Sequence, residues 1–147
     1  GGAEQERRAA QLRAVMARMP ATSALLRGGV TLSPGDPLAR ALDAQSLSGQ
    51  TDFAVCGQDG LIGVLTRDDV SAALRRRGAD VPVGEVMRTQ FPTAEAGGTL
   101  LDLERVLERS GSPVASLNDG GRFVGLVTVE SVHRAWRAFL RWGPHRV

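Results

Sequence analysis

The stretch GVLTRDDV at residues 63–70 decides the fold, because it returns as GLVTVESV at residues 125–132. Shifting the sequence by 62 residues aligns the two stretches without a gap, so that Gly63 falls on Gly125 and Thr66 on Thr128. The same shift aligns further turn, cap and apolar positions: Thr31 with Thr93, Gly35 with Gly97, Leu38 with Leu100, Gly49 with Gly111 and Val70 with Val132. These matches indicate two copies of one structural unit.

Each copy is predicted to contain the same series of elements. In the first copy, an extended piece at residues 30–32 and a turn precede a helix whose N-cap is Asp36. Two apolar strands at residues 53–56 and 61–65 form a hairpin, and a second helix covers residues 67–77. The second copy repeats this order, beginning with another short extended piece and ending with another helix.

The expected fold class is therefore α/β in the α+β sense. It consists of two β-α-β-β-α units packed face to face with pseudo-two-fold symmetry and preceded by an N-terminal helix. We divide the chain into a helical leader at residues 1–21, a first unit at 22–82, and a second unit with a C-terminal helix at 83–147. The leader has a narrow apolar stripe that includes Met16. This stripe fits packing on the pair, a dimer seam, or contact with another part of a longer chain.

The composition is that of an ordinary folded protein. With 147 residues, 42% hydrophobic and 23% charged, the chain suits one domain or two small ones. The single cysteine, Cys56, excludes an internal disulfide framework and a multi-cysteine zinc module, and we interpret it as a small buried hydrophobe. No apolar stretch reaches the length of a membrane span. We therefore expect a soluble segment in a reducing, cytoplasmic compartment, with no membrane insertion of its own.

The charge pattern argues against a nucleic-acid partner. All 18 basic residues are arginine, and 16 acidic residues reduce the net charge to +2. The one dense cluster, Arg75 to Arg77, is followed by Gly78, which is typical of a helix C-terminus where cations oppose the negative end of the dipole. Aromatic residues make up only 4% of the chain, too few to provide stacking platforms for bases.

The repeat, the strand-to-helix stretch at residues 63–70 and the segment VGEVM at residues 83–87 together resemble a tandem pair of CBS domains, the module named after cystathionine β-synthase. The resemblance covers about residues 22–140. It implies a non-catalytic regulatory module, commonly a homodimer. Such a module senses an adenosine-containing ligand (AMP, ADP, ATP or S-adenosylmethionine) and controls an attached or partner protein. A ligand-free structural or dimerisation module is the alternative.

The resemblance also implies a ligand site. By its motif, Thr66 contacts a phosphate and Asp69 holds the ribose diol. The other residues implied are those lining the adenine slot and the equivalent threonine of the second copy: Val30, Thr31, Phe53, Ala54 and Thr128. Ser131 replaces the aspartate in the second copy, so at most one good nucleotide site is expected. The pattern Thr-x-x-Asp is also a capping box, which satisfies the first amides of a helix and needs no ligand.

Catalytic and metal sites are not expected. The sequence offers no plausible catalytic triad or acid-base pair, and His133 and His145 have no apparent metal-binding partners. The leader followed by the first unit also resembles the cytosolic extension of bacterial site-2-protease-type membrane metalloproteases. This second resemblance implies a regulatory appendage of a membrane enzyme whose H-E-x-x-H zinc helix is not in this sequence.

Overall fold

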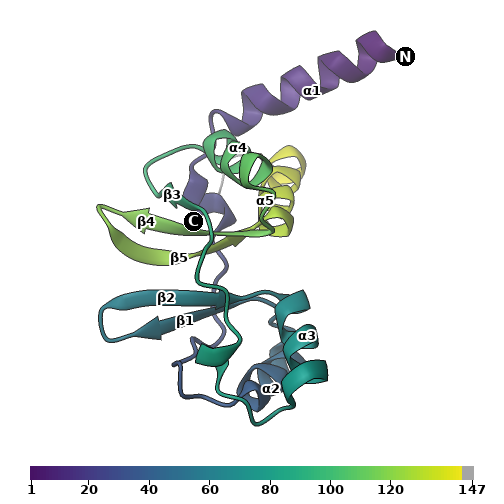
Figure 1. Cartoon of the computed structure of the whole chain (residues 1–147). Helices are drawn as coiled ribbons and strands as arrows, with labels where there is room; N and C mark the ends of the chain where they lie inside the picture. Colours follow the sequence, from purple (N-terminus) through teal and green to yellow (C-terminus); the bar gives the residue numbers. More distant parts are fainter. Residues whose placement is uncertain (144–147) are drawn as a thin grey trace. The chain divides into compact units, whose positions relative to one another are not determined.

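Five helices and two small sheets form residues 1–143, the part of the chain that this computed structural model describes (Figure 1). The helices are α1 (Gly2–Met16), α2 (Leu38–Ser48), α3 (Arg67–Arg77), α4 (Leu100–Ser110) and α5 (Val129–Trp142). The strands are β1 (Phe53–Gly57), β2 (Gly60–Leu65), β3 (Thr93–Glu95), β4 (Val114–Asp119) and β5 (Arg122–Thr128). Two 3-10 turns are η1 (Ala21–Ala24) and η2 (Val83–Glu85). The predicted mixed fold with an N-terminal helix is confirmed.

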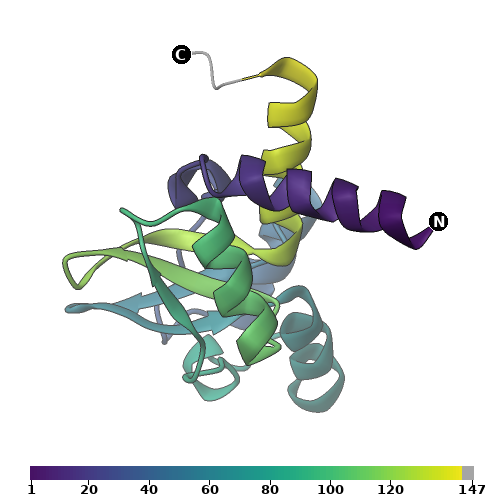
Figure 2. The same cartoon turned by 90° about the horizontal axis from the view of Figure 1, so that it is seen from above.

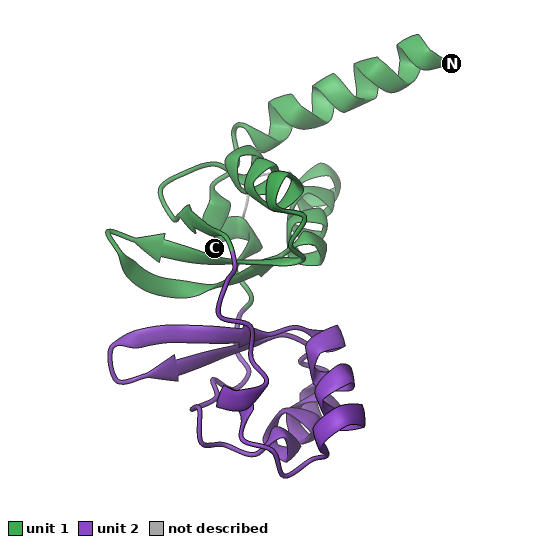
Figure 3. Cartoon of the chain, in the orientation of Figure 1, with its two compact units in different colours: residues 1–26, 92–147 green, residues 27–91 purple. Residues whose placement is uncertain are grey.

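The chain forms two compact units whose composition differs from the expected division (Figure 3). Unit 1 contains Gly1–Leu26 together with Pro92–Val147, and unit 2 is Arg27–Phe91. The leader therefore packs with the second sequence copy, and residues 83–91 pack with the first copy, although the sequence placed the boundaries at 21/22 and 82/83.

The repeat itself explains this exchange. In unit 1 the amide of Ala21 donates a hydrogen bond to the carbonyl of Gly98 at 3.0 Å, and in unit 2 the amide of Val83 donates to the carbonyl of Asp36 at 2.8 Å. Ala21 and Val83 are equivalent under the shift of 62 residues, as are Asp36 and Gly98. Each unit is thus completed by the segment that precedes the other copy in sequence, and a sequence period alone does not reveal which copy a segment joins.

Unit 2 is a two-stranded sheet covered by α2 and α3. Strands β1 and β2 pair antiparallel, with a bulge between Val55 and Cys56. The piece expected to be a strand at residues 30–32 forms only a single parallel bridge, from Leu32 to Val55. The buried core of this unit consists of Leu32, Leu38, Ala41, Ala44, Phe53, Val55, Leu65, Val70, Ala73, Val81 and Val83.

Helix α2 begins one residue later than expected. Its N-cap is Pro37, so the prediction that Asp36 caps this helix is wrong. Backbone carbonyls from further along the chain satisfy the first helix amides instead, since Leu38 donates to Val81 at 2.9 Å and Ala39 donates to Ala79 at 2.8 Å. The Asp36 carboxylate is then available for an ion pair with a later residue of α2.

Unit 1 has a three-stranded sheet in the order β3-β4-β5, with β3 parallel and β5 antiparallel to β4. Met16 and Met19 are buried with residues of α4, β4 and β5, so the stripe of the leader packs against unit 1. Residues 2–11 of α1 are all exposed, and both views show the N-terminal part of this helix extending away from the rest of its unit (Figures 1 and 2). No helix in residues 1–143 combines the length and apolar character needed to cross a bilayer.

Gly63 allows the segment after η2 to lie against β2. A Cβ atom at this position would collide with the side chain of Met87 and would lie 3.1 Å from the carbonyl oxygen of Arg88. We expect Gly63→Ala to lower the free energy of unfolding by about 1–3 kcal/mol, because the added methyl forces the Met87 side chain to move and presses against the carbonyl of Arg88. Gly97→Ala is the matched control, since nothing lies within 4 Å of its Cβ position. Equal urea midpoints for the two variants would contradict the expectation.

Candidate functional site

Thr66 and Asp69 form a complete capping box at the junction of β2 and α3. Thr66 is the N-cap residue in an extended conformation, and its hydroxyl accepts a hydrogen bond from the Asp69 amide at 3.2 Å. The Thr66 amide in turn donates to Oδ2 of Asp69 at 2.9 Å. The capping predicted as the alternative role of these residues is therefore present. It leaves one edge of the carboxylate facing away from the helix.

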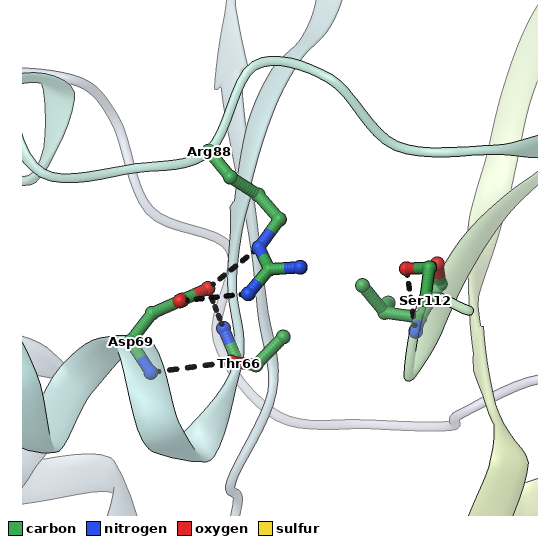
Figure 4. A network of polar contacts seen from close by, with 5 residues as sticks. Thr66, Asp69, Arg88 and Ser112 are labelled. Carbon is green, nitrogen blue, oxygen red and sulfur yellow. Dashed lines mark hydrogen bonds and ion pairs between the residues drawn. The ribbon is translucent and has the colours of Figure 1, made fainter. Parts of the chain in front are cut away.

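Arg88 occupies that edge (Figure 4). Its Nε donates to Oδ2 of Asp69 at 3.0 Å, and its Nη2 donates to Oδ1 at 2.8 Å, so the ion pair is bidentate. The Arg88 side chain is 35% exposed and that of Asp69 is 20% exposed. Paired, half-buried charges of this geometry form stronger hydrogen bonds than neutral groups do.

The backbone fixes Arg88 in this position. Its amide donates to the carbonyl of Val64 at 2.9 Å, and its carbonyl accepts from the amide of Val64 at 3.0 Å. The sequence alone did not point to Arg88, because 19 residues separate it from Asp69 and no local pattern joins them. The repeat pairs Arg88 with Leu26, so the two copies differ in charge at this position. The backbone contact is the same in both copies, because the amide of Leu26 donates to the carbonyl of Leu126, the equivalent of Val64, at 2.9 Å.

The surroundings of Asp69 favour its ionised form. Burial alone would raise the pKa of the Asp69 carboxyl, but hydrogen bonds from Arg88 and Thr66 and the charge of Arg88 outweigh burial and lower it. The hydrogen bond to Asp69 correspondingly raises the pKa of the Arg88 guanidinium. Both groups are charged at neutral pH.

The second copy has a capping box without charges. The hydroxyl of Thr128 accepts from the Ser131 amide at 2.9 Å, and the Thr128 amide donates to the Ser131 hydroxyl oxygen at 2.8 Å. Both side chains are buried, and the Ser131 hydroxyl donates to the carbonyl of Thr128 at 3.1 Å. Thr128 is therefore engaged within its own unit in hydrogen bonds that need no ligand.

The remaining predicted residues of unit 2 lie at the same end of its sheet as Thr66. Phe53, the first residue of β1, is paired with Leu65, the last residue of β2, and Ala54 accepts a hydrogen bond from Leu32 through its carbonyl. Phe53 is fully buried in the core and Ala54 is nearly so, whereas Thr31 is exposed.

Val30 has a further partner that sequence analysis did not identify. Its amide and carbonyl both bond the side-chain amide of Gln50, at 2.8 and 2.9 Å. Since Gln50 also donates to the carbonyl of Asp52 just before β1, it ties the 30–32 segment to the start of that strand.

Cys56, His133 and His145 are the other reactive side chains that the sequence offers. Cys56 is partly rather than fully buried, and burial raises the pKa of its thiol. The His133 ring packs edge-on against Trp136, with 6.2 Å between the ring centroids. Residues 1–143 contain no group of three side chains suited to hold a metal ion. His145 lies outside the described residues.

Unit 1 also contains an open cavity of about 470 Å³ between α4 and α5, which the sequence did not indicate. Leu107 and Val132 form part of its apolar wall, and Glu104, Glu108 and His133 contribute polar groups. Burial and the nearby Glu108 raise the pKa of the Glu104 carboxyl.

Comparison with known proteins agrees with this architecture. The model of the CBS domain matches twice, at residues 13–76 and 83–138. The chain belongs to the CBS domain family. CBS pairs are regulatory modules, and this one is a non-catalytic module of that kind. No curated protein matches the sequence.

Solved structures share the fold of this CBS pair at low sequence identity. The CBS domain of a bacterial CNNM/CorC family Mg²⁺ transporter in complex with ATP is 17% identical, with a TM-score of 0.72 over 90% of this chain and 97% of that chain. CBSX2 in complex with AMP is 19% identical, with a TM-score of 0.68 over 84% of this chain and 99% of that chain. The CBS domain of a membrane protein from Sphaerobacter thermophilus is 21% identical, with a TM-score of 0.69 over 92% and 98%.

Proposed function

We propose that this CBS pair binds an adenosine-containing nucleotide through unit 2. Asp69 would accept hydrogen bonds from the ribose hydroxyls, Thr66 would contact a phosphate, and the 30–32 segment with the start of β1 would border the base. Because Phe53 is buried, its contribution would come from its backbone. Thr128 would have at most a minor role, since the second copy lacks the carboxylate.

The observation that carries the proposal is the Asp69 carboxylate at the N-terminus of α3, ionised and still 20% exposed. A carboxylate can accept from two vicinal hydroxyls, which a serine cannot match. The nearby helix N-terminus favours a phosphate. The ATP and AMP complexes of the two structural relatives add support for a nucleotide of this class.

The regulatory role follows from the ligand. A nucleotide shifts a conformational equilibrium only by its differential affinity for two states, and the favoured state would then control an attached or partner protein. We propose a homodimer in the cytoplasm as the working form. We propose a membrane enzyme of the site-2-protease type as the regulated partner, on the resemblance of the leader.

A ligand-free interaction module is the second candidate. The observation that favours it is that Thr66, Asp69 and Arg88 satisfy one another's hydrogen-bonding groups. In that case Thr66 and Asp69 would only stabilise α3, and the CBS pair would act through its contacts with other proteins.

Calorimetric titration and thermal shift with AMP, ADP, ATP and S-adenosylmethionine distinguish the two candidates. A ligand at about 100 times its Kd stabilises the protein by about 2.7 kcal/mol. Asp69→Asn is expected to abolish this stabilisation. Asp102→Asn is the matched control, because Asp102 forms the same capping box with Thr99 but has no proposed ligand role.

Two outcomes would overturn nucleotide binding at this site. One is the absence of binding at millimolar concentration by wild type. The other is an unchanged Kd in Asp69→Asn. If no ligand stabilises wild type and Asp69→Asn only melts at a lower temperature, Asp69 is a helix cap and the interaction module is the better description.

A further inference from the structure

The Asp69 carboxylate has too few free acceptor sites for a ribose diol while Arg88 is paired with it. An ionised carboxylate offers about four lone-pair sites. Oδ2 accepts from the Thr66 amide and from Arg88 Nε, and Oδ1 accepts from Arg88 Nη2. One site on Oδ1 is left, whereas two vicinal hydroxyls need two. A ribose can therefore bind Asp69 through both hydroxyls only if one existing donor leaves.

Arg88 is the donor that can leave. The Thr66 amide belongs to the backbone at the start of α3 and is held by the capping box. The Arg88 guanidinium stands at the end of a flexible side chain that is 35% exposed. The backbone of Arg88 stays bonded to Val64, so the displaced guanidinium remains beside the site.

We propose that Arg88 is a specificity gate: it competes with the ribose for Asp69, and once displaced it binds the ligand's phosphate. This inference rests on the proposed nucleotide site. A guanidinium stays charged and forms bidentate bonds to phosphate, so an anionic ligand supplies the partner that displacement removes. The gate selects phosphorylated adenosine ligands over adenosine itself, and over S-adenosylmethionine, which is cationic overall.

The second copy supports a linked role for the two charges. Ser131 stands at the position of Asp69, and Leu26 at the position of Arg88, so both charges are absent together. Leu26 keeps the backbone bond that its counterpart makes. The backbone arrangement therefore does not require an arginine. Arg88 is present where there is a carboxylate to oppose it, since a half-buried charge without a partner is costly.

Adenosine and AMP are the probes for the gate, because they differ by one phosphate. Isothermal titration compares wild type with Arg88→Met, which keeps the aliphatic stem. In Arg88→Met we expect adenosine to bind about three- to fivefold more tightly, because its competitor for Asp69 is gone. We expect AMP to bind about tenfold more weakly, because the phosphate loses a charged donor. The wild-type preference for AMP should thus collapse.

Arg77→Met is the matched control. Arg77 pairs with Glu85 in the same unit, so this variant removes an equal charge without touching Asp69. It should leave both dissociation constants within about twofold of wild type. Melting curves of wild type, Arg88→Met and Arg77→Met report whether each protein is folded. A further variant, Arg88→Lys, keeps the charge but loses the bidentate hydrogen bonds of the guanidinium.

The outcomes separate the gate from the nucleotide site. Weaker binding of both probes in Arg88→Met, by equal factors, would overturn the gate and leave Arg88 as a positioning residue. Unchanged binding of both would also overturn it and would leave the nucleotide site standing. The outcome that supports the gate most directly is that adenosine binds Arg88→Met but does not bind wild type. If neither adenosine nor AMP binds wild type or Arg88→Met, the gate fails. The proposed function fails with it only if ADP, ATP and S-adenosylmethionine do not bind wild type either.

Discussion

Replacing Met16 with alanine is expected to destabilise unit 1 by about 2–4 kcal/mol, although Met16 lies in the leader that the sequence sets apart from both copies. The side chain is fully buried in a cluster with Met19, Leu100 and Leu103. Truncation removes apolar contacts and leaves a cavity that α4 and β4 cannot close without moving.

Urea unfolding followed by tryptophan fluorescence measures this effect directly. The two tryptophans of the chain, Trp136 and Trp142, both belong to α5, and Trp136 packs against the core of unit 1. Gln11→Ala is the control, because Gln11 is exposed on the same helix. A chain that lacks residues 1–11 should also unfold at the wild-type midpoint. An unchanged midpoint for Met16→Ala would mean that the leader is no part of the core.

Most elements of this fold could be predicted from the sequence, because they depend on local patterns. The shift of 62 residues, the helix at residues 67–77 and the hairpin before it follow from apolar periodicity and turn residues. The membership of the leader could not be predicted in this way. Residues 20–26 and 82–88 are equivalent in the repeat, and local sequence gives no reason for each to pack with a copy other than the one that it precedes.

The candidate site shows the same division between local and distant interactions. The link between Thr66 and Asp69 spans three residues, so a motif reveals it. Arg88 reaches Asp69 through a backbone pairing with Val64 that the absence of a side chain at Gly63 permits. Comparing the two copies at the Asp69 and Arg88 positions could have revealed the pair, since both charges are lost together at Ser131 and Leu26.

Phe53→Ala is expected to destabilise unit 2 by about 3–5 kcal/mol, which is a large part of the stability of a small domain. Phe53 is fully buried with Leu38 of α2, Leu65 of β2 and other residues from both helices of the unit. Far-UV circular dichroism in urea measures the effect, because both tryptophans lie outside this unit. Leu47→Ala is the control, since Leu47 is 87% exposed on α2 and should change the free energy of unfolding by less than about 0.5 kcal/mol.

Phe53→Leu separates packing from ligand contact at the same position. Leucine keeps most of the buried volume, so we expect a loss of only about 1–1.5 kcal/mol and a folded protein whose nucleotide affinity can be measured. Because the ring faces the core, the Kd for AMP should stay within about twofold of wild type. A Kd raised tenfold in a fully folded Phe53→Leu would instead mean that the ring itself borders the base. Phe53 would then contact both the core and the adenine base.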